Sequence, residues 1–147
     1  MALVHLKKLK NRYIWQRIFY ERLTEPVHLN LLSLGVALFG SFRMKVAYDL
    51  VIRHNHAYAI LAAADLAREL GLKRVTLIEL GVAAGAGLLN MGAIARRVTR
   101  ETGVEFDIVG FDTGKGMPAP RSCKDHPEIY QQGDFPMDEA ALRSRLP

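Results

Sequence analysis

The sequence contains a single cysteine, Cys123, among its 147 residues. One cysteine cannot form an internal disulfide, and no group of cysteines is present that could hold a structural zinc ion. The 12 glycines and 6 prolines are too few for a collagen-like or low-complexity chain. These shortages exclude a disulfide framework and favour a reducing compartment, so we expect a cytoplasmic protein with one folded core.

The sequence also lacks a hydrophobic run long enough to span a membrane. Its most apolar stretch, Val27–Phe42, is interrupted by His28, Asn30 and Ser33 and is shorter than the roughly 20 residues that a spanning helix needs. The first residues show no uninterrupted apolar segment followed by a cleavage site, so they do not read as a signal peptide. We therefore expect at most a peripheral location at the inner face of a membrane.

Acidic residues are scarce in the first half of the chain. Residues 1–74 hold 12 Lys/Arg against 5 Asp/Glu, and residues 75–147 hold 8 against 10. The basic residues gather near the start, between apolar residues at helical spacing: Lys7, Lys8, Lys10, Arg12, Arg17 and Arg22. This pattern predicts an amphipathic helix, not a nucleic-acid-binding patch. Three roles are open for such a helix. It packs on its own domain, it binds a partner, or residues 1–42 contact an anionic membrane surface.

The first half of the chain reads as helical. Residues 3–25 and 27–70 predict helices broken near Pro26 and Gly40, because proline cannot continue the helical hydrogen-bond ladder. The clearest helix is Ala57–Leu70, which is rich in strong helix formers and is followed by a glycine that ends it.

In the second half of the chain, the spacing of apolar residues changes from a helical to a strand pattern. Val75–Leu80 is an apolar run typical of a parallel strand covered on both faces. The glycine-rich turn Gly81–Gly87, the helical pattern Leu88–Glu101 and a second strand, Glu105–Phe111, follow. This order predicts a βαβ unit with its ligand site at the carboxyl ends of the strands.

These patterns predict an α/β chain with two parts. We assign residues 1–55 to a helical N-terminal region and residues 56–147 to a nucleotide-binding type of domain, ending in a short helix over Pro136–Leu146. Two strands make an incomplete sheet whose apolar edge needs cover. We therefore expect either the N-terminal part of a longer protein or a homo-oligomer.

The strongest chemical signal lies where the first strand becomes a helix. The segment Glu79–Gly87 reads ELGVAAGAG, and glycines there let a ligand approach the backbone and the helix N-terminus. The segment resembles the first motif of class I S-adenosylmethionine-dependent methyltransferases, in which glycines follow an acidic residue. Glu79, Gly81 and Gly85 fit that motif, and Ala83 stands where its middle glycine is usual.

The end of the second strand extends this resemblance. Asp112 stands where the family's acidic residue accepts hydrogen bonds from the ribose hydroxyls of the cofactor. The stretch Phe111–Pro120 (FDTGKGMPAP) is similar to that of the macrocin-type sugar O-methyltransferases, with Gly114 where an aromatic residue is common. The resemblance covers roughly residues 56–147.

The resemblance implies a Rossmann-like sheet that binds S-adenosylmethionine and methylates a hydroxyl of a small hydroxylated or sugar-bearing metabolite. It implies a cofactor site formed by Glu79, Gly81, Ala83, Gly85, Gly87, Asp112 and Thr113. Such enzymes generally exceed 200 residues and place their catalytic carboxylates after later strands. We therefore expect an N-terminal methyltransferase fragment without a metal site or an assigned catalytic residue, and the isolated chain need not be active.

Other readings stay open. The main alternative is a non-catalytic scaffold that binds a membrane or a partner and keeps a vestigial nucleotide-binding fold. A nicotinamide-binding protein would prefer G-x-G-x-x-G, whose last glycine is replaced by Asn90. Five residues are conceivable on the acceptor side, although a structural role is favoured for each: His54, His56, Tyr58, Asp125 and His126.

Overall fold

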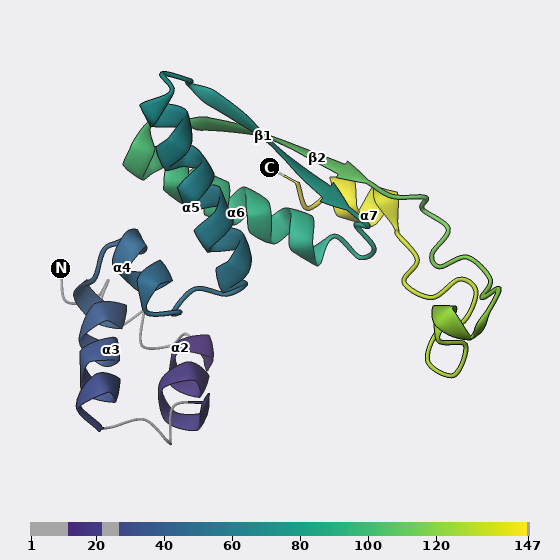
Figure 1. The fold of residues 1–147 in the computed structure, drawn as a ribbon, viewed down its shortest axis with the longest axis horizontal. Helices are drawn as coiled ribbons and strands as arrows, with labels where there is room; N and C mark the ends of the chain where they lie inside the picture. The colour runs from purple at the N-terminus through teal and green to yellow at the C-terminus, as the bar shows by residue number, and fades with distance from the viewer. Residues whose placement is uncertain (1–11, 22–26, 147) are drawn as a thin grey trace. The chain divides into compact units, whose positions relative to one another are not determined.

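The structure is a computed structural model that describes residues 12–21 and 27–146. The described residues form helices and one two-stranded parallel sheet, which agrees with the expected α/β class. The chain divides into two compact units, an N-terminal unit that ends at Asp65 and a C-terminal unit that starts at Leu66 (Figure 1). The division falls inside helix α5 (His54–Glu69), whereas the predicted boundary after residue 55 lies at the start of this helix.

The N-terminal unit is helical. Besides α5, its described elements are α2 (Arg12–Gln16), the π-helical turn η1 (Arg17–Glu21), α3 (Val27–Phe39) and α4 (Phe42–Ala47). The break predicted near Gly40 is confirmed, since α4 restarts after Ser41, whose hydroxyl accepts a hydrogen bond from the Met44 N–H at 3.2 Å. The break predicted at Pro26 and the lysines at positions 7, 8 and 10 lie outside the described residues.

A second break, between α4 and α5, was not predicted. Asp49 and Arg53 adopt left-handed backbone conformations, with φ of 51° and 55°, and turn the chain without glycine or proline. Arg17 forms an ion pair with Asp49 and donates from Nε to its carbonyl oxygen at 3.3 Å. The turn is therefore held by a residue that lies far away in the sequence.

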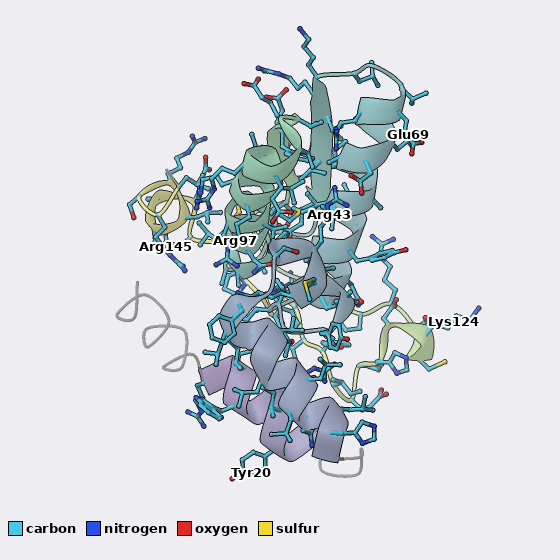
Figure 2. All side chains as sticks on the ribbon, turned by 90° about the vertical axis from the view of Figure 1, so that its left-hand side faces the viewer. Tyr20, Arg43, Glu69, Arg97, Lys124 and Arg145 are labelled. Atoms are coloured by element: carbon cyan, nitrogen blue, oxygen red, sulfur yellow. The ribbon has the colours of Figure 1, made fainter. Side chains whose placement is uncertain are left out.

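The core of the N-terminal unit contains part of the predicted amphipathic segment. Ile14 and Ile18 are buried together with Val36, Ala37 and Leu50. Arg43 of α4 (labelled in Figure 2) forms an ion pair with Asp65, with Nη1 2.6 Å from Oδ2. The apolar cluster, with these ion pairs at its surface, holds the helices of this unit together.

The C-terminal unit contains the predicted βαβ unit. Its elements are β1 (Arg74–Leu80), α6 (Ala86–Thr102), β2 (Glu105–Phe111), the 3-10 turn η2 (Cys123–Asp125) and α7 (Glu139–Arg143). The strands pair in parallel, and α6 runs along one face of the pair (Figure 1). Gly71 and Gly103 both have positive φ, so the predicted glycine stops after the two long helices are confirmed.

The sheet is covered on one face only, which corrects the prediction for the first strand. Val75, Leu77 and Glu79 are half-buried, whereas Ile78 and Leu80 are exposed. The reason is that a single crossover helix lies on a single face of a parallel pair. The exposed apolar residues of the other face come from both strands: Ile78, Leu80, Val109 and Phe111.

The last described helix, α7, is shorter than the predicted Pro136–Leu146. Asp138 caps it by accepting a hydrogen bond from the Ala141 N–H at 2.9 Å. Glu139 lies in its first turn, where a carboxylate favours the helix dipole. No helix among the described residues is both long enough and apolar enough to cross a bilayer.

Candidate functional site

The two strands end at the same edge of the sheet. Leu80 pairs with Phe111 at the end of the register, and the Gly81 N–H donates to the Phe111 carbonyl at 2.8 Å. The loop after β1 and the loop after β2 therefore leave the sheet side by side. This arrangement brings Asp112 to the glycine-rich turn.

The carboxylate of Asp112 holds the two loops together. Its Oδ2 accepts hydrogen bonds from the N–H groups of Val82 at 2.7 Å and Ala83 at 2.9 Å, and its Oδ1 accepts one from Gly114 at 2.7 Å. These bonds, the one from Ala83 first, hold the pKa of Asp112 below its ordinary value, although desolvation opposes them. A carboxylate offers about four acceptor positions, so roughly one remains for a ligand.

The Asp112 bond also accounts for the unusual backbone at Ala83. This residue has φ of 46°, in the left-handed region that favours glycine. The position thus has a backbone conformation that glycine adopts more easily than alanine. Its N–H bond to Asp112 holds an alanine in that conformation.

A cavity of about 590 Å³ lies beside these loops. Four of the seven predicted site residues line it, namely Gly81, Ala83, Asp112 and Thr113. Gly81 has φ of 84°, and a Cβ added there would meet no atom within 4 Å. The backbone at Gly81 therefore faces open space in which a ligand could approach closely.

The other three predicted site residues do not line this cavity. Gly85 is the N-cap of α6, and a side chain there would collide with Leu142 of α7. Gly87 lies in the first turn of α6, where a side chain would collide with the carboxylate of Glu79. These glycines permit close packing at the start of α6, and Glu79 lies beside that helix N-terminus.

The remaining walls of the cavity come from residues that were not assigned to the site from the sequence: Phe111, Gly116, Met117, Pro118, Asp134 and Phe135. The loop folds back because the Met117 N–H donates to the Asp134 carbonyl at 2.7 Å and the Gly133 N–H donates to the Met117 carbonyl at 2.9 Å. Phe135 has φ of 58°, and its ring centroid lies 6.0 Å from that of Tyr130. The walls are therefore mainly aromatic and apolar.

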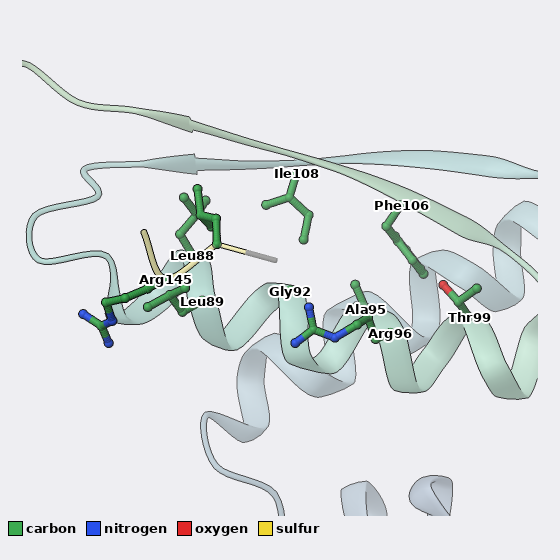
Figure 3. Close-up of a pocket in the computed structure, with 10 residues that line it drawn as sticks. Leu88, Leu89, Gly92, Ala95, Arg96, Thr99, Phe106, Ile108 and Arg145 are labelled. Carbon is green, nitrogen blue, oxygen red and sulfur yellow. The ribbon is translucent and has the colours of Figure 1, made fainter. Parts of the chain in front are cut away.

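A second cavity of about 590 Å³ lies between α6 and β2. Figure 3 shows Phe106 and Ile108 of β2 pointing toward α6, where Gly92 and Ala95 leave space. It is lined mainly by apolar groups and contains no carboxylate, so it lacks the polar anchor that Asp112 gives the cavity at the strand ends.

The conceivable acceptor-side residues lie outside both cavities. Asp125 accepts hydrogen bonds from the N–H groups of Arg121 at 2.8 Å and Ser122 at 3.0 Å, and so caps η2. His126 Nδ1 lies 3.0 Å from a carboxylate oxygen of Glu128. Across residues 12–21 and 27–146, no three His, Cys, Asp or Glu side chains group in a way that could hold a metal ion.

Scans against protein-family models, curated proteins and solved structures find no match to this chain. The interpretation of the site therefore depends on the residues and geometry of this chain.

Proposed function

We propose that the C-terminal unit binds S-adenosylmethionine as part of a class I methyltransferase of the macrocin-type O-methyltransferase kind. Its acceptor would be a hydroxyl of a small hydroxylated or sugar-bearing metabolite. The observation that carries the proposal is the junction of the two loops, where Asp112 binds the glycine-rich turn beside the cavity. Ligands of parallel α/β sheets bind at this edge.

The chemistry of the cavity suits the cofactor. Asp112 keeps about one acceptor position, which is enough to bind one ribose hydroxyl in this conformation. Phe111, Met117 and Phe135 offer apolar and aromatic walls for an adenine ring. The missing side chain at Gly81 leaves room for a close approach to the backbone.

When bound, the cofactor supplies an electrophilic methyl group. The residues of this chain then have a positioning task, because alignment of the acceptor with the methyl–sulfur bond is the main requirement of such a transfer. Asp112 performs this task indirectly, since its bonds to Val82 and Ala83 fix the turn that borders the cavity. A general base for the acceptor hydroxyl is not assigned among these residues.

Calorimetric titration of the chain with S-adenosylhomocysteine tests the proposal. We expect micromolar binding. Gly81→Ala should weaken it about tenfold, because the added methyl group would crowd a ligand that lies against the backbone. Gly103→Ala is the matched control. Gly103 also has positive φ, and a Cβ added there would meet no atom within 4 Å, but it lies at the far end of α6 and outside the cavity.

Two results would reject the proposal. One is the absence of binding by a chain that circular dichroism shows to be folded. The other is an equal loss of affinity in both glycine variants, because that would reflect backbone strain alone. Protection by NAD without any effect of S-adenosylhomocysteine would instead favour the nicotinamide-binding reading.

A further inference from the structure

The N-terminal unit exposes an apolar surface that has no part in the proposed cofactor site. Helix α3 contains no charged residue. It exposes Leu31, Leu32 and Phe39, which are 65%, 49% and 73% accessible, while Ser33, Val36 and Ala37 on its other side are buried. A helix that packs one apolar side on the core usually presents polar residues to water on the other, so a second apolar side indicates a binding surface.

These exposed residues share one side of the helix. Leu31, Gly35 and Phe39 are spaced four residues apart, and Leu32 is adjacent, so these four positions lie on the same side of the helix. We call this set the leucine face. Tyr20 of η1 also points away from the unit, as Figure 2 shows, and is exposed.

The charge of the chain indicates which kind of partner binds the leucine face. Residues 1–65 hold nine Lys/Arg and four Asp/Glu, whereas residues 66–147 hold eleven of each, so the net charge of +5 belongs to the N-terminal unit. Two such units would repel each other across a shared apolar face. An anionic lipid surface would attract the same charge and accept the leucine side chains.

The length of α3 restricts its orientation at a membrane. Its 13 residues span about 20 Å, less than the roughly 30 Å hydrocarbon core of a bilayer. A helix of this length with one exposed apolar side lies in the plane of the membrane interface.

We propose that the leucine face of α3 binds the surface of an anionic phospholipid membrane. The side chains of Leu31 and Leu32 enter the boundary between headgroups and acyl chains, and the net positive charge of the unit attracts it to the anionic surface. This interaction uses no residue of the strand-end cavity and is independent of the proposed methyltransferase function.

Vesicle flotation of the 147-residue chain tests this interaction. The probes are vesicles of phosphatidylcholine with phosphatidylserine and vesicles of phosphatidylcholine alone. The test variant is Leu31→Gln/Leu32→Gln, and the matched control is Leu70→Gln/Leu72→Gln, whose leucines are 64% and 53% exposed in the C-terminal unit. Trp15 fluorescence checks that each variant remains folded.

We expect binding to the anionic vesicles that the test variant weakens about tenfold or more, because two leucines no longer enter the lipid. The control should bind like the parent chain, and added salt should weaken binding. Unchanged affinity of the test variant, no binding to either vesicle, or equal binding to both would overturn the proposal.

A dimer that the test variant dissociates would also overturn it, because a second copy would then occupy the face. An unchanged affinity for S-adenosylhomocysteine in the test variant separates this result from the cofactor site.

Discussion

The two units leave different kinds of apolar surface exposed. The N-terminal unit, in which basic residues outnumber acidic ones, exposes Leu31, Leu32 and Phe39 on α3. The C-terminal unit, whose charges balance, exposes Ile78, Leu80, Val109 and Phe111 on the open face of the sheet. An apolar surface on a unit of net positive charge favours an anionic membrane, whereas an open sheet face lacks the helices that usually cover parallel strands.

The units also differ in what stabilises them. The N-terminal unit depends on an apolar cluster around Ile18. The strand-end region of the C-terminal unit depends on hydrogen bonds to Asp112 and on the loop pairing at Met117. The ion pairs of Arg74 with Glu105 and Asp107 are exposed and contribute little. Changes directed at the cluster and at the loops should therefore act separately.

The largest expected effect is that of Ile18→Ala. Ile18 is almost fully buried, so its truncation should lower the free energy of unfolding by about 2–5 kcal/mol. Urea titration followed by the emission of Trp15, the single tryptophan, reports on this unit. Leu31→Ala is the control, since an exposed substitution should change stability by less than about 0.5 kcal/mol. Equal effects of the two substitutions would contradict the assigned core.

Gly116→Ala should destabilise the loop of the C-terminal unit and leave the N-terminal unit unchanged. Gly116 has φ of 76°, and an added Cβ would lie 2.5 Å from the Asp134 carbonyl oxygen. Strain and overpacking together should cost the loop about 2–4 kcal/mol. Faster hydrogen exchange at the Met117 and Gly133 amides would report the loss, without a change in Trp15 emission.

Gly133→Ala is the matched control for that substitution. Gly133 also has positive φ, but an added Cβ there meets no atom within 4 Å. It should cost only the left-handed strain, about 1–2 kcal/mol. Equal protection of the loop amides in both variants would show that the backbone contact at Gly116 is unimportant.

Much of this fold could be predicted because its signals are local. The run Val75–Leu80 and the stretch Glu105–Phe111 are strands in the structure, and the glycines at 71 and 103 end their helices. The break at Asp49 and Arg53 escaped prediction, since it has no glycine or proline and depends on the distant Arg17.

The site was less predictable for a related reason. A carboxylate after a strand can bind a ligand hydroxyl or a backbone N–H, and only the fold shows that Asp112 meets Val82 and Ala83. The packing roles of Gly85 and Gly87 depend on side chains from other elements. Phe135 reaches the cavity through loop pairing, and its only sequence signal was the preceding turn-forming Gly133.

Lowering the pH should loosen the two strand-end loops before it affects the backbone amides of α6. The pKa of folded Asp112 lies below its ordinary value of 3.8, so its contribution is complete above that pH and is lost as the pH falls through the folded pKa. The amide signals of Val82, Ala83 and Gly114 should titrate together below pH 3.8. The Gly103 amide, bonded to Thr99, is the control. An inflection above 3.8 would contradict the assigned bonds.

The smallest expected effect is that of Ala83→Gly. Glycine removes the left-handed strain at this position but adds freedom to the unfolded chain. The two effects nearly offset each other, which leaves a stabilisation of about 0.5 kcal/mol. Thermal unfolding followed by far-UV circular dichroism measures it. A clear destabilisation would mean that the alanine methyl group makes a favourable contact in the cavity wall.

The most direct test of the central claim is a nuclear magnetic resonance titration of the isotopically labelled chain with S-adenosylhomocysteine. The account predicts that amide shifts gather at Gly81, Ala83, Asp112 and Thr113, with Ile18 and Leu31 unchanged. Unchanged spectra at saturating ligand, or shifts confined to the N-terminal unit, would contradict the assignment of the strand-end cavity as the cofactor site.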